Sequence, residues 1–83
     1  MKEIRRLLNI MDDLRTKCPW DKKQTTQSLK NLTIEEVYEL TEAVETGNFE
    51  NLKEELGDLL LHIVFYSKIA SEKKKFNFMD VVN

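Results

Sequence analysis

The chain has 83 residues, of which 34% are charged and only 8% aromatic, with one proline and two glycines. This length allows one hydrophobic core, and so few helix-breaking residues favour an all-α fold over a sandwich or barrel. A formal net charge of −2 gives no general attraction to nucleic acid or to an anionic membrane. No apolar run approaches the roughly 20 residues of a membrane span. A single cysteine suits a reducing compartment. We therefore expect one cytoplasmic domain over residues 1–83.

The first predicted element is an amphipathic helix over residues 2–17. Its apolar residues recur at helical spacing and are Ile4, Leu7, Leu8, Met11 and Leu14. Pro19 ends this helix, because the residue before a proline disfavours helical backbone angles. Residues 18–32 are polar and predicted to be irregular, with at most a short helical turn.

A second helix is predicted from Thr33 to Gly47. Thr33 and Glu36 have the spacing of a capping box, and Gly47 suits the left-handed position that ends a helix. The residues expected to form its buried stripe are Ile34, Val37, Leu40, Thr41 and Val44.

A third helix is predicted over residues 49–73, and residues 76–83 resemble the opening turn of a fourth. Residues 59–65 of the third helix are apolar on nearly every side. A chain of this length can hardly bury such a helix on most sides. The pattern therefore predicts that a partner chain covers it.

Nine acids and one base lie between residues 35 and 58, and unrelieved like charges repel along a helix. If the second and third helices fold back antiparallel about Gly47, Glu39 lies level with Glu55, and Glu36 with Asp58. Four converging carboxylates favour a hard cation, magnesium or manganese rather than zinc. The alternative is a solvated acidic face, since acids in a first helical turn also suit the helix dipole.

The acidic residues belong to a longer motif. The segments EEVYE at 35–39 and ELGD at 55–58 resemble the EExxE…ExxD signature of the MazG-type nucleoside triphosphate pyrophosphohydrolases. CPWDKKQT at 18–25 and FNFMDV at 76–81 resemble further segments of the same family, in the same order. The resemblance covers nearly the whole chain.

This resemblance implies a fold, a reaction and a set of metal ligands. The fold is a four-helix bundle of antiparallel helical hairpins, completed by dimerisation and sometimes tetrameric. The reaction is magnesium-dependent hydrolysis of a nucleoside triphosphate to the monophosphate and pyrophosphate, with a house-cleaning or stress-related role. Carried over by position, the metal ligands are Glu36, Glu39, Glu55 and Asp58, and Glu35 or Glu36 is the candidate general base.

Candidate substrate contacts are weaker, and each has a simpler alternative. Trp20 could stack on a nucleobase or plug the core. Lys53 and Lys22 could contact phosphate or remain solvated. His62 could support a metal ligand or be satisfied within the core.

Relatives are expected to continue through the fourth helix into an arginine- and histidine-bearing segment that this chain lacks. Two further functions therefore stay open. One is a catalytically incomplete regulatory module that binds metal or nucleotide, and the other is a plain helical dimerisation domain with an acidic surface.

Overall fold

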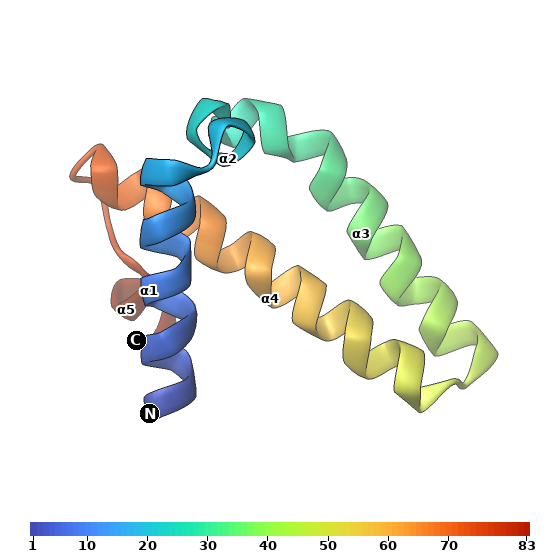
Figure 1. Cartoon of the computed structure of the whole chain (residues 1–83). Helices are drawn as coiled ribbons and strands as arrows, with labels where there is room; N and C mark the ends of the chain where they lie inside the picture. The colour runs from blue at the N-terminus through green and yellow to red at the C-terminus, as the bar shows by residue number, and fades with distance from the viewer.

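The computed structural model describes residues 1–83 and contains five helices and no strand, which confirms the all-α prediction. The helices are α1 (Lys2–Lys17), α2 (Pro19–Lys23), α3 (Thr26–Thr46), α4 (Phe49–Glu72) and α5 (Phe78–Val82). The long helices α3 and α4 form an antiparallel hairpin, α1 packs against the C-terminal half of α4, and α2 lies at the open end of the hairpin (Figure 1). None of the helices is long and apolar enough to cross a membrane.

Most predicted helix ends are confirmed. Cys18 has extended backbone angles, φ −90° and ψ 118°, and α1 ends before it. Gly47 adopts the left-handed conformation at φ 69°. This conformation is unfavourable for residues that carry a side chain, and glycine is the usual residue there. The Asn48 side chain then accepts a hydrogen bond from the Asn51 backbone N–H at 3.1 Å and begins α4.

The predicted start of α3 at Thr33 is wrong. The helix begins at Thr26, because Thr25 and Ser28 form a reciprocal capping box with distances of 2.8 and 3.0 Å. Thr33 lies inside the helix. The polar segment that was predicted to be irregular therefore contains α2 and the first two turns of α3, and it buries Leu29 against the core.

The core lies where α1 crosses α4. Its buried members are Met11, Leu29, Val64, Phe65 and Ile69, with Leu7, Leu8, Tyr66 and Phe78 packed against them. Only Leu29 and Ala43 are buried on α3.

Of the predicted buried stripe of α3, only Leu40 is partly buried in the single chain, and the other members are wrong. Ile34, Val37 and Val44 have exposed fractions of 61%, 41% and 59%. The side of α3 that faces α4 carries a different series at helical spacing, Leu29, Thr33, Glu36, Leu40 and Ala43. Acidic and hydroxyl groups therefore share the space between the two helices with apolar residues, while Ile34, Val37 and Val44 face outward.

Candidate functional site

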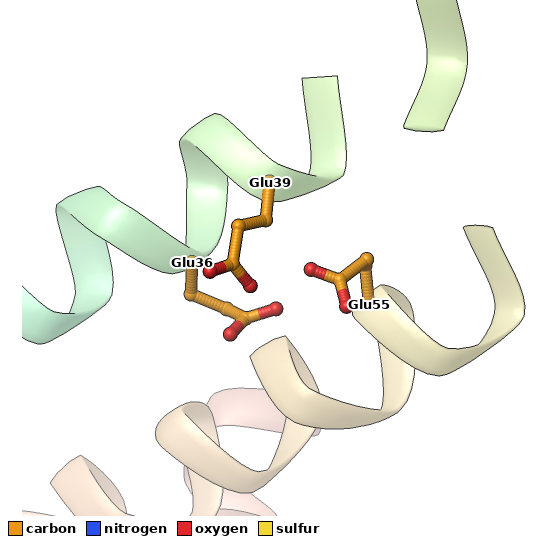
Figure 2. A group of neighbouring side chains, drawn as sticks. All are labelled: Glu36, Glu39 and Glu55. Atoms are coloured by element: carbon orange, nitrogen blue, oxygen red, sulfur yellow. The ribbon is translucent and has the colours of Figure 1, made fainter. Parts of the chain in front are cut away.

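Three carboxylates converge between α3 and α4. One oxygen from each of Glu36, Glu39 and Glu55 lies within 4.8 Å of the others. Figure 2 shows the two α3 side chains and the α4 side chain pointing toward one another. Glu36 and Glu39 are neighbours on one face of α3, and Glu55 lies opposite Glu39, as the hairpin register predicts. Asp58 is exposed and lies outside this group.

Crowding raises the pKa of all three carboxyl groups. Burial is the main cause for Glu36, and the charges of Asp58 and Glu39 add to it against the lowering effect of a hydrogen bond with Glu55. The pKa of Glu39 rises mainly through its hydrogen bond with Glu55 and the charge of that neighbour. For Glu55 the hydrogen bond with Glu39 lowers the pKa, but burial, Glu36 and Asp58 together outweigh it. The folded chain therefore holds protons here more tightly than ordinary glutamates do.

Two oxygens of the cluster are buried without a hydrogen-bond partner, Glu36 Oε1 and Glu55 Oε2. An unsatisfied buried acceptor is costly, and more so when it is charged. A cation placed among the three carboxylates would satisfy both atoms and remove the repulsion. Because every available ligand is a carboxylate oxygen, the donor set suits a hard divalent cation.

Comparison with known proteins identifies the family of the chain. Residues 24–83 match the model of the MazG nucleotide pyrophosphohydrolase domain. The chain belongs to this family. It is 45% identical to a nucleoside triphosphate pyrophosphohydrolase of Escherichia coli K12 over 98% of its own length, and 50% identical to the nucleoside triphosphate pyrophosphohydrolase/pyrophosphatase MazG of Thermotoga maritima over 92%.

The fold has a solved counterpart. The crystal structure of a MazG-related protein from Thermotoga maritima superposes with a TM-score of 0.82 at 29% identity, over 94% of this chain and 68% of that one. The two curated relatives are much longer, and the chain spans 32% and 31% of their lengths. The comparison thus covers about a third of each curated relative.

The other acidic and basic candidates of this MazG chain lie outside the cluster. Glu35 is exposed and acts on Glu39 only through its charge. Lys53 Nζ pairs with the exposed Glu50 at 3.2 Å. Lys22 is exposed, and its carbonyl accepts a hydrogen bond from Arg15. Their proposed roles stay predictions.

Trp20 combines features of both of its predicted roles. Its ring meets the Phe65 ring edge-on, with centroids 6.4 Å apart and an interplanar angle of 81°. It is nevertheless 53% exposed. Trp20 therefore packs on the core through its contact with Phe65 and leaves about half of its surface exposed.

Arg15 positions the segment that carries Trp20, a role that no pattern in the sequence indicates. Its guanidinium binds Glu72 through two nitrogens, one at 2.9 Å. Nη1 also donates to the carbonyls of Asp21 at 2.6 Å and Gln24 at 3.0 Å. The same group lies 5.9 Å from the centre of the Phe65 ring. One half-buried guanidinium thus ties α1, the α2 segment and the end of α4 together.

His62 is hydrogen-bonded within the helix hairpin. Thr33 Oγ1 lies 2.8 Å from His62 Nδ1, 2.6 Å from the Tyr66 hydroxyl and 3.1 Å from the Leu29 carbonyl. Of the two interpretations of His62, these contacts support a histidine hydrogen-bonded within the core, through Nδ1. The hairpin register that pairs Glu39 with Glu55 also brings Thr33 to within one residue of the height of His62 along the hairpin. The contact between Thr33 and His62 could therefore have been predicted from the sequence.

Proposed function

We propose that the chain is the metal-binding part of a nucleoside triphosphate pyrophosphohydrolase. The reaction is hydrolysis of a nucleoside triphosphate to the monophosphate and pyrophosphate, with magnesium, or manganese, as the cation. The observation that carries the proposal is the group formed by Glu36, Glu39 and Glu55, which leaves two buried oxygens unpartnered. The relatives named as pyrophosphohydrolases support the same reaction.

In this proposal, each acidic residue has a separate role. Glu36, Glu39 and Glu55 hold the cation, and Asp58, one turn from Glu55 on α4, completes the ligand set. When bound, the cation neutralises phosphate oxygens and lowers the pKa of a water molecule. Glu35 or the second oxygen of Glu36 accepts the proton that this water releases.

The substrate contacts come from outside the cluster. The free surface of Trp20 stacks on the base. Lys53 lies two residues before Glu55 and Lys22 two residues after Trp20, and in this proposal both contact phosphate. Both side chains are exposed and free to reorient toward a bound substrate.

Pyrophosphate release from a panel of nucleoside triphosphates tests the proposal. With magnesium we expect monophosphate and pyrophosphate in equal amounts, and with EDTA neither. Glu39→Gln should reduce the rate by at least about 100-fold, as expected when a preorganised charge at the reacting phosphate is lost. Glu42→Gln is the matched control, since Glu42 is exposed and lies outside the ligand group. Absence of release, with magnesium still raising the melting temperature, would favour the regulatory module instead.

We also propose that a second copy of the chain completes the bundle. Only eight of the 83 residues are buried. Leu60, Leu61 and Ile63 of the apolar segment in α4 remain 36–39% exposed, and Ile34 and Val37 of α3 face outward. A homodimer, or a tetramer built from two such dimers, would cover these residues, and a cytoplasmic role in nucleotide control fits the proposed reaction.

A further inference from the structure

An apolar cavity of about 200 Å³ lies where α2 meets the α3–α4 hairpin. Its lining includes Trp20, Leu29, Leu61 and Phe65, and the polar members are His62 and Asp21. An engineered apolar cavity of about 150 Å³ is large enough to bind benzene. The cavity is therefore large enough to accept an aromatic ring.

The cavity and the acidic cluster follow one another along the same side of the hairpin. Leu29 precedes Glu36 by seven residues on α3, and His62 follows Glu55 by seven residues on α4. Seven residues are about two helical turns, which returns the side chain to the same face about 10 Å further along the axis. This separation is comparable to the extent of a nucleoside between its base and its 5′-phosphate. A nucleotide with its phosphates at the cluster could place its base in the cavity.

The contacts of Thr33 determine which ring nitrogen of His62 carries the proton. A threonine hydroxyl has one proton to donate and can accept two hydrogen bonds. All three contacts of Thr33 are satisfied only if its hydroxyl donates to the Leu29 carbonyl and accepts from both Tyr66 and His62 Nδ1. The neutral ring of His62 then carries its proton on Nδ1. Nε2, for which the chain supplies no hydrogen-bond partner, is an acceptor.

We propose that this cavity binds the nucleobase and that His62 Nε2 accepts a hydrogen bond from an exocyclic amino group of the base. The proposal rests on the proposed function, which supplies the nucleotide. The carboxylate of Asp21 is also an acceptor, so both polar groups in the lining favour a donor. A carbonyl oxygen at the same place would face an acceptor lone pair. The site should therefore prefer a 6-aminopurine to a 6-oxopurine.

Titration of Trp20 fluorescence with ATP and with ITP, in the presence of magnesium, tests this preference. The two nucleotides differ by an amino group and a carbonyl at purine position 6, and Trp20 is the only tryptophan in the chain. We expect ATP to bind about tenfold more tightly, the effect of gaining one hydrogen bond and avoiding one unpaired acceptor. Equilibrium dialysis of the same nucleotides gives the dissociation constants independently of the fluorescence.

Two variants test whether His62 is responsible. In His62→Gln the side-chain amide can present either its oxygen or its NH₂ group, so the ATP-to-ITP ratio should approach one. Thr33→Val frees the ring to carry its proton on either nitrogen, so the ratio should also fall. Thr41→Val is the matched control, because the hydroxyl of Thr41 bonds only the Tyr38 carbonyl at 2.7 Å, and its ratio should stay at the parent value.

The outcomes separate this inference from the proposed function. A preference for ATP that His62→Gln removes supports the base site, even if no nucleotide is hydrolysed and the pyrophosphohydrolase proposal fails. Equal affinities in the parent, a preference for ITP, or a ratio that His62→Gln leaves unchanged would overturn the base site. Absence of binding of either nucleotide in dialysis would overturn it as well.

Discussion

Glu39 is the residue at which the charge balance of the cluster can be changed with least disturbance to packing, because its side chain is exposed. Without a divalent cation, Glu39→Gln should raise the melting temperature by a few degrees, since it removes repulsion from Glu55, Asp58 and Glu35. With magnesium the order should reverse, because the parent gains stability from binding and the variant loses a ligand. Thermal unfolding with EDTA and with magnesium measures both effects.

A plain acidic surface gives a different result in that experiment. If the carboxylates hold no cation, Glu39→Gln stabilises the chain equally under both conditions. Glu42→Gln serves again as the control. It should leave the stabilisation by magnesium unchanged.

The pH dependence of stability reports the same repulsion. The folded-state pKa values of Glu36, Glu39 and Glu55 lie above the ordinary value of 4.5, so the folded chain binds protons more tightly than the unfolded chain. In EDTA, lowering the pH from 7 toward about 4.5 should therefore raise the melting temperature. Glu72, whose pKa Arg15 lowers, contributes stability that is lost only below that range. A melting temperature that falls steadily between pH 7 and 4.5 would contradict this assignment.

The meeting of Glu39 with Glu55 could be predicted from the position of the turn at Gly47 and from helical spacing. Once Gly47 is taken as the turn, residue numbers alone place Glu39 opposite Glu55. The same arithmetic pairs Glu36 with Asp58, yet Glu36 groups with Glu55, and Asp58 acts on it only through charge. The register fixes the level of each residue, but side-chain rotamers decide which oxygens meet, and the sequence does not specify them.

At the scale of the helices, the face that α3 presents to α4 was the main error of the sequence-based prediction. Two stripes at helical spacing overlap on this helix, and the prediction chose the more apolar one, with Ile34 and Val37. In the structure that stripe faces outward, and the one containing Leu29 and Ala43 faces α4. Hydrophobic periodicity identifies a face to be covered, but it does not say whether the chain itself or another molecule covers it.

The arrangement of α1, α2 and α4 depends on Arg15. Lysine keeps the charge but cannot reproduce the two-nitrogen contact with Glu72 together with the bonds to three carbonyls. We expect Arg15→Lys to cost about 2 kcal/mol and to lower the melting temperature by about 10 °C. Arg6→Lys, an exposed change on the same helix, is the control and should have little effect. Near-equal melting temperatures for the two variants would show that the Arg15 contacts contribute little to stability.

For the whole molecule, the small buried fraction and the outward apolar stripe are two consequences of one arrangement. Because α3 presents acidic and hydroxyl residues toward α4 alongside a few apolar ones, Ile34, Val37 and Val44 remain exposed for an outer contact. The exposed residues of the apolar segment in α4 add to the apolar surface that such a contact would cover. A cluster of carboxylates inside a hairpin leaves less apolar packing within the chain, and in the proposed assembly a second copy of the chain supplies it.

Ile34→Asp tests this arrangement against a matched change at Val82. Both residues are 61% exposed in the single chain, but Ile34 lies on the outer stripe of α3 and Val82 on the terminal helix α5. In an isolated chain both substitutions should change stability by no more than about 0.5 kcal/mol. If a second copy covers α3, Ile34→Asp buries an unpaired charge and should dissociate the assembly, whereas Val82→Asp should not.

Sedimentation velocity gives the mass of each variant. The melting temperature of the parent should rise with protein concentration, while that of Ile34→Asp should not. A parent that sediments as a monomer at all concentrations would show that the outer stripe of α3 is not covered by a second copy.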